Sequence, residues 1–213
     1  MTATADLPAL LGAWVAARSV ARGLPAPVAE KGGWRVDTRS DAEECRWVFP
    51  HMSEGLCEVG REVDRPRRLI KLCGTVDELA GALPSGWSVT ATGAFMRFDG
   101  EFGPASPPSG YSFEIQRDGD VACARILIDG EAVATGYAAA TDQAFIFDRI
   151  MVHPAHRRRG LASALIAGLT QGSDLDRRKV LLVASVMGVA LYERLGWTNL
   201  SPYSTAEFAG VSS

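Results

Sequence analysis

The stretch VHPAHRRRGLA, residues 152–162, connects a predicted strand to a predicted helix. A helix start presents unpaired backbone N–H groups and the positive end of the helix dipole, which together favour a phosphate. Gly160 has no Cβ, so a ligand can approach the backbone closely, and the small residue Ala162 follows. The pattern predicts a pyrophosphate-binding turn; its alternative is a basic, solvated turn at the start of an ordinary helix.

Two other phosphate loops do not match this turn. No Gly-Lys-Ser/Thr follows it, as a nucleotide P-loop requires, and no Gly-x-Gly-x-x-Gly dinucleotide loop is present. The choice between a pyrophosphate-binding turn and a solvated basic turn therefore depends on the strands and helices around it.

The C-terminal half alternates strand and helix patterns around this turn. Asp129-Gly130 is a two-residue hairpin signal between two strands. The fold class that this order predicts is α/β, with a mixed sheet covered by helices. The expected strands are 111–117, 121–128, 131–140, 145–152, 179–184 and 197–205, and the expected helices are 158–172 and 186–195.

The N-terminal half carries weaker signals and no motif that can be assigned to chemistry. Glycine and proline are dense in 101–110, so we predict two regions, 1–109 and 110–213, with the first helping to form a substrate site. No internal repeat stands out. The expected helices are 7–21 and 76–83, and the expected strands are 46–49, 69–73 and 87–92.

Composition narrows the function class. The chain has 213 residues, is 47% hydrophobic and has a formal net charge of -3, so no basic field draws in nucleic acid. No apolar run reaches the roughly 18 residues of a membrane helix, and the first residues lack the basic start of a secretory signal. A cytoplasmic protein without membrane or nucleic-acid partners is expected. No metal is expected either, because the four cysteines form no C-x-x-C pair and His153 and His156 lack a third ligand.

Two motifs in order resemble the GNAT acetyltransferase superfamily. VxPxxRRRGLA resembles its R/Q-x-x-G-x-G/A cofactor motif, and ALYERLGW at 190–197 resembles its second signature. The resemblance covers about 111–205 and implies a GNAT catalytic core that transfers an acetyl group from acetyl-CoA to the amine of a small molecule or peptide, by direct attack in a ternary complex. The alternatives are an enzyme of the same fold that uses a longer acyl-CoA, and a degenerate domain that binds acyl-CoA as a non-catalytic sensor or structural ligand.

The resemblance also implies roles for particular residues. Tyr192 stands where the family places a tyrosine that reaches the coenzyme A sulfur, and Ser185 stands where many members have an asparagine that bonds the pantetheine arm. The residues implied to bind the cofactor are Ile150, Met151, Val152, Arg157, Arg158, Arg159, Gly160, Leu161, Ala162 and Ser185.

Asp148 is the candidate base for the acceptor amine. Side chains alternate along a strand, so Asp148 shares a face with Ile146 and Ile150 and is the ionisable group among them. Some family members carry a base on this face of this strand. The alternatives are a carboxylate that orients substrate and one that is paired with a nearby arginine. An exposed final strand could also pair with a second subunit and give a homodimer.

Overall fold

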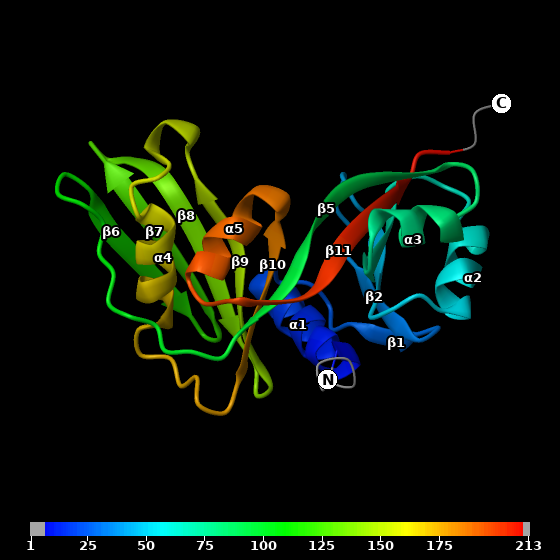
Figure 1. Cartoon of the computed structure of the whole chain (residues 1–213), viewed down its shortest axis with the longest axis horizontal. Coiled ribbons are helices and arrows are strands. Elements are labelled where there is room, and N and C mark those ends of the chain that lie inside the picture. The colour runs from blue at the N-terminus through cyan, green and yellow to red at the C-terminus, as the bar shows by residue number, and fades with distance from the viewer. Residues whose placement is uncertain (1–6, 211–213) are drawn as a thin grey trace.

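The computed structural model describes residues 7–210, which form one mixed sheet with helices on its faces (Figure 1). The helices are α1 (Leu7–Ala21), α2 (Glu54–Glu62), α3 (Val76–Ala82), the 3-10 turn η1 (Pro154–His156), α4 (Leu161–Thr170) and α5 (Val186–Arg194). The strands are β1 (Val28–Glu30), β2 (Gly33–Asp37), β3 (Cys45–Phe49), β4 (Arg68–Cys73), β5 (Trp87–Phe98), β6 (Ser112–Asp118), β7 (Val121–Ile128), β8 (Glu131–Ala140), β9 (Ala144–Val152), β10 (Lys179–Ser185) and β11 (Thr198–Phe208). The predicted fold class is confirmed.

The two halves of the chain exchange strands within this sheet. The strand order is β1-β2-β3-β4-β11-β5-β10-β9-β8-β7-β6. Strand β5 of the first half pairs with β10, and β11 of the second half pairs with β4. Strands β5 and β11 also pair with each other and run side by side across the middle of the molecule (Figure 1). The sheet is therefore continuous across the boundary predicted between 1–109 and 110–213.

The central six strands form an internal structural repeat. The series β3-α2-β4-α3-β5 and β9-α4-β10-α5-β11 have the same order of elements, and each begins with two parallel strands joined through a helix. Their order in the sheet, β3-β4-β11-β5-β10-β9, reads the same from both ends when each strand is exchanged for its counterpart. The sequence gives no sign of this repeat, because it lies in the topology.

Helices cover opposite faces of the second half's strands. Phe145 and Phe147 of β9 pack in the core that α4 and α5 cover, whereas Ile146 packs in the core that α1 covers. This alternation follows from the period of two along a strand. Any site between β9 and β10 is consequently accessible from two chemically different sides.

The final strand is not at an edge of the sheet. β11 is hydrogen-bonded to β4 on one side and to β5 on the other. The expectation that an exposed final strand could pair with a second subunit is therefore wrong, because the first half of the same chain already covers both edges of that strand. Among the described helices, none is long and apolar enough to cross a membrane.

Candidate active site

Strands β9 and β10 pair at one end and then separate. Parallel pairing joins Ala144–Ile146 to Lys179–Leu181, and the described part of the chain shows no register pair after that. Each strand continues while bonded to its outer neighbour: β9 to β8 and β10 to β5. The two facing edges therefore leave backbone groups with which an extended ligand can pair like an added strand.

A cavity of about 980 Å³ lies at this gap and takes side chains from both faces of the sheet. Leu182 and Tyr192 line it from the face of α4 and α5, and Trp14, Arg18 and Tyr203 line it from the face of α1. The cavity thus passes through the sheet. Its volume lies near the upper end of the range usual for small-molecule and cofactor sites, about 300–1,000 Å³.

The turn that enters α4 has the geometry of an anion site. Gly160 is the N-cap of α4 and has a φ of 77°, and Arg158 also takes a left-handed φ of 59°. The helix consequently begins at Leu161, three residues after the predicted start at 158. Within residues 7–210, the backbone N–H groups from Arg158 to Ala162 donate to no protein acceptor. They remain available to a ligand.

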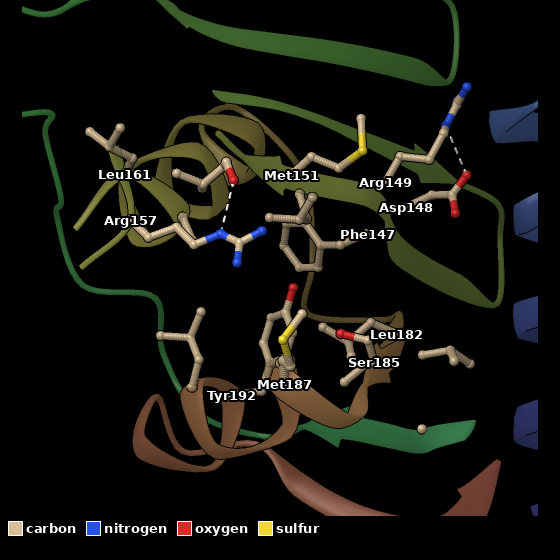
Figure 2. A pocket seen from close by; sticks show the side chains of 18 of the residues that line it. Phe147, Asp148, Arg149, Met151, Arg157, Leu161, Leu182, Ser185, Met187 and Tyr192 are labelled. Atoms are coloured by element: carbon tan, nitrogen blue, oxygen red, sulfur yellow. Dashed lines mark hydrogen bonds and ion pairs between the residues drawn. The ribbon is translucent and has the colours of Figure 1, made fainter. Parts of the chain in front are cut away.

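The three arginines of the turn have different orientations. Arg157 Nε donates to the carbonyl of Val152 at 3.3 Å (Figure 2), and Arg158 lines the cavity. Arg159 lies outside the cavity lining, with its Nη1 3.2 Å from the hydroxyl of Tyr111. The expected contribution of Arg159 is thus limited to its backbone in this structure, because Tyr111 holds its guanidinium. All the other predicted site residues line the cavity.

The two loop histidines stabilise this turn. His156 Nδ1 lies 2.9 Å from the Tyr111 hydroxyl, and His153 Nδ1 accepts from the Ala155 N–H at 3.3 Å. In the part of the chain that the structure describes, no group of three His, Cys, Asp or Glu side chains could hold a metal ion.

Tyr192 brings a hydroxyl into the cavity from α5. The residue is 7% exposed, and its ring meets Trp197 edge-on with the centroids 5.6 Å apart. Its hydroxyl points across the cavity towards Phe147 (Figure 2). Burial raises the pKa of Tyr192 to about 12. The group therefore stays a hydrogen-bond donor throughout the physiological pH range.

Two exposed methionines add an apolar surface to the cavity. The sequence analysis named Met151 as a cofactor-binding residue but did not name Met187. Met151 on β9 and Met187 on α5 are 59% and 78% exposed, and both line the cavity (Figure 2). Ser185, another lining residue, ends β10 and is paired with Gly93 of β5. A Cβ at Gly93 would lie 2.0 Å from the carbonyl oxygen of Ala184, so only glycine allows this close strand contact.

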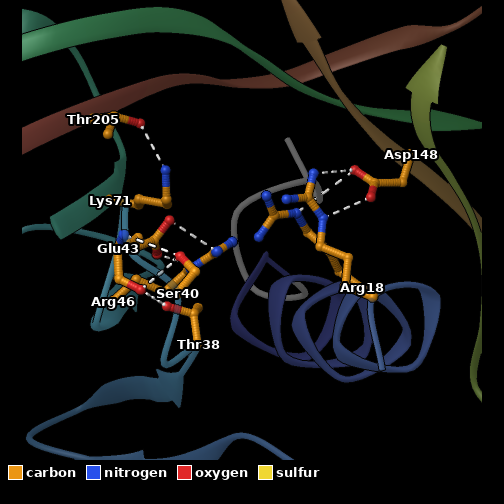
Figure 3. A network of polar contacts seen from close by, with 9 residues as sticks. Arg18, Thr38, Ser40, Glu43, Arg46, Lys71, Asp148 and Thr205 are labelled. Carbon is orange, nitrogen blue, oxygen red and sulfur yellow. Dashed lines mark hydrogen bonds and ion pairs between the residues drawn. The ribbon is translucent and has the colours of Figure 1, made fainter. Parts of the chain in front are cut away.

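Asp148 is held by arginines. Its two oxygens accept from Arg22 Nε at 2.7 Å and Nη2 at 2.9 Å, and Arg18 Nε lies 3.8 Å away (Figure 3). Arg149 Nε lies 3.1 Å from Asp148 (Figure 2). Burial acts to raise the pKa of Asp148, but the hydrogen bonds from Arg22 and the charges of the three arginines outweigh it and hold the pKa below its usual value. A carboxylate with a low pKa accepts a proton weakly. Of the roles considered for it, these contacts favour the paired carboxylate over the base.

Asp148→Asn is expected to lower the free energy of unfolding by about 2 kcal/mol, because it leaves partly buried arginines without their counter-charge. The matched control is Asp99→Asn: Asp99 Oδ2 also lies 2.7 Å from an arginine, Arg97, but Asp99 is 57% exposed and its pair contributes little. Thermal unfolding at pH 7 measures both. Since the folded pKa of Asp148 is lowered, its contribution is present above the unfolded pKa and is lost as the pH falls through the folded value. Equal destabilisation by the two variants would contradict the assignment.

The sequence analysis missed the cations on the α1 face. Arg18 lies in the last turn of α1, Arg22 follows the end of that helix, and Lys71 lies on β4; all three line the cavity. Arginines that interrupt an apolar helix, and a lysine inside an apolar strand, were the signals that could have found them.

Comparison with known families supports the geometry. Residues 113–199 match the family model described as acetyltransferase (GNAT) domain. Residues 113–199 are therefore similar to a GNAT domain. The match contains the separated strands, the turn at Gly160 and Tyr192. The matched segment begins after the 101–110 loop.

Solved structures share the fold of the whole chain. A GCN5-related N-acetyltransferase from Kribbella flavida has a TM-score of 0.64 at 15% identity, over 96% of each chain. An acetyltransferase of the GNAT family from Novosphingobium aromaticivorans has a TM-score of 0.58 at 18% identity, over 99% of each. A GCN5-related N-acetyltransferase from Sphaerobacter thermophilus has a TM-score of 0.54 at 13% identity, over 99% of this chain and 95% of that chain. At these identities the likeness shows the fold, including the first hundred residues. No functionally curated protein matches the sequence closely enough to count as a relative.

Proposed function

We propose that this protein transfers an acetyl group from acetyl-CoA to a primary amine by direct attack in a ternary complex. The observation that carries the proposal is the cavity through the sheet, which joins the anion-binding turn on one face to a polar pocket on the other. Two substrates entering from opposite faces would meet between β9 and β10 beside Tyr192.

The residues present fit coenzyme A. The free N–H groups from Arg158 to Ala162, with the Arg158 side chain, would bind the diphosphate. The separated edge of β9, at Ile150 and Val152, would pair with the pantetheine amides. Met151 and Met187 supply an apolar surface for the arm. When bound, acetyl-CoA supplies the activated acetyl group as a thioester.

The attacking amine has to be neutral, because an ammonium has no lone pair. Arg18, Arg22 and Lys71 line the α1 side of the cavity, and such cations lower the pKa of a neighbouring ammonium. The amine can then lose its proton to water without a strong protein base. Tyr192 donates a hydrogen bond to the departing sulfur. Loss of the amine proton to water is consistent with the lowered pKa of Asp148, which makes this carboxylate a weak base.

Two measurements test the proposal. Isothermal titration with acetyl-CoA should show one site per chain with a dissociation constant in the micromolar range, about 8 kcal/mol of binding free energy. Release of coenzyme A over a panel of primary amines should show turnover with at least one of them. Binding without turnover on any amine would favour the non-catalytic sensor, and absence of binding would overturn the assignment.

A further inference from the structure

The α1 side of the cavity has an excess of positive charge. The lining residues there include Arg18 from α1, Arg22 just after that helix, Lys71 from β4 and Arg149 from β9. Asp148 is the only carboxylate among the described residues that line the cavity. Since this side faces away from the diphosphate turn, the phosphates of coenzyme A do not account for its cations.

The two carboxylates in this region are already engaged. Arg22 donates to both oxygens of Asp148. Glu43 lies behind Lys71, outside the lining, and Arg46 donates to both of its oxygens (Figure 3). The protein thus neutralises Arg22 and Arg46 with bidentate pairs, the strongest form of ion pair.

Arg18 and Lys71 are left without such a partner. Arg18 Nε is 3.8 Å from Asp148, beyond hydrogen-bond length. The Lys71 ammonium donates to the Thr205 hydroxyl at 3.3 Å and has no carboxylate within 4 Å among residues 7–210. Burial, followed by the charge of Arg18, lowers the pKa of Lys71 to about 8; Glu43 and Glu207 oppose this effect and Arg22 adds to it. Neither cation has a carboxylate within hydrogen-bonding distance among the described residues.

Two neutral donors border the same region. The hydroxyl of Tyr203 and the indole N–H of Trp14 are buried and find no hydrogen-bond partner in the described chain, and both residues line the cavity. Their rings meet edge-on, with the centroids 5.8 Å apart, and Arg18 lies over the Trp14 ring at 5.3 Å. Buried donors without acceptors cost free energy. A group rich in acceptor oxygens would satisfy this cluster.

We infer that the acceptor amine carries an anionic oxygen group, a carboxylate or a phosphate, which binds between Arg18 and Lys71. The inference rests on the proposed function and names the substrate class. A simple amine would enter as a cation among cations and be repelled, whereas an anionic group offsets the charge of Arg18 and Lys71 and leaves the amine free to approach β9.

The test compares matched amines. The panel holds the standard amino acids, their carboxamides and their decarboxylated amines, with O-phosphoethanolamine paired with ethanolamine. Coenzyme A release measures kcat/KM, which we expect to be about tenfold or more higher for the preferred anionic amine than for its neutral counterparts. The phosphate pair shows which of the two anions is preferred.

Three variants locate the anion site. Lys71→Met and Arg18→Gln should raise KM for the preferred anionic amine about tenfold or more, and should change activity on its carboxamide by a clearly smaller factor, because the carboxamide loses only the effect of the charge on its amine pKa. Lys71→Arg should retain most of the preference because it keeps the charge. Arg125→Gln, at an exposed arginine of β7 outside this cavity, is the control and should change neither substrate. Circular dichroism verifies folding, and titration verifies acetyl-CoA binding, in every variant.

The outcomes separate the two proposals. If anionic and neutral amines react equally well, or if Lys71→Met affects both equally, the anion site is overturned and the acetyltransferase proposal stands. If no amine reacts, the acetyltransferase proposal fails. Titration of the anionic amines into the protein with coenzyme A then decides the anion site: binding that Lys71→Met weakens supports it, and no binding overturns it.

Discussion

Gly160→Glu is expected to abolish acetyl-CoA binding, raising the dissociation constant by about 100-fold or more, while the chain still folds. Gly160 caps α4 with a φ of 77°, and a Cβ built there has no protein atom within 4 Å. The new side chain would therefore project into open space at the helix start. Its carboxylate would compete with the diphosphate for the same N–H groups and repel it, and such like-charge contacts cost several kcal/mol.

Gly172→Glu is the matched control for this substitution. Gly172 follows α4, has a φ of 71°, and also has no atom within 4 Å of a built Cβ. Both variants add the same charge and the same left-handed backbone strain, about 1–2 kcal/mol, so both should lower the melting temperature similarly. Titration with acetyl-CoA should find normal affinity in Gly172→Glu only. Normal affinity in Gly160→Glu would remove the turn from the site.

Local chemistry made the second half of the fold predictable. Asp129 and Gly130 take φ values of 51° and 82°, as the tight turn between β7 and β8 requires, and this matches the expected hairpin. The error at α4 also has a local cause. Arg158 and Gly160 adopt left-handed conformations, which delay the helix until Leu161 although the apolar periodicity starts earlier.

Long-range pairing made the rest unpredictable. The alternation of apolar residues indicates that β5 and β11 are strands, but it cannot say that each would pair with the other half of the chain. That exchange brings Lys71 and Thr205 to the same cavity as Asp148.

The sequence placed Asp148 beside Ile146 on the α1 face of β9 because strand alternation is local. The same alternation put Ile150 on that face, and this was wrong: Ile150 packs in the core of the opposite face, because Arg149 takes a left-handed φ of 53° and the pairing with β8 shifts register there. The sequence could not show that Asp148 is paired with Arg22, which lies 126 positions away.

Tyr192→Phe is expected to lower kcat by about 100-fold while acetyl-CoA affinity changes little. The hydroxyl is the only part removed, so the ring contact with Trp197 remains and the fold is preserved. Tyr137→Phe is the matched control, since Tyr137 contacts Arg149 through its ring and lies outside the cavity lining. Single-turnover measurement of coenzyme A release reads the chemical step directly. An unchanged rate in Tyr192→Phe would exclude this hydroxyl from the reaction.

The raised pKa of Tyr192 determines what the hydroxyl can do. A pKa of about 12 lies well above the value of about 8.5 for an ordinary thiol, so complete proton transfer to the leaving thiolate is uphill by about 3 to 4 pK units. In the proposed reaction, Tyr192 would therefore stabilise the thiolate by a hydrogen bond, and the final proton would come from solvent. Because the folded pKa is raised, the protonated form persists until the pH rises through about 12. We expect kcat to show no loss from this group between pH 7 and 10; a descending limb in that range that disappears in Tyr192→Phe would contradict the hydrogen-bond role.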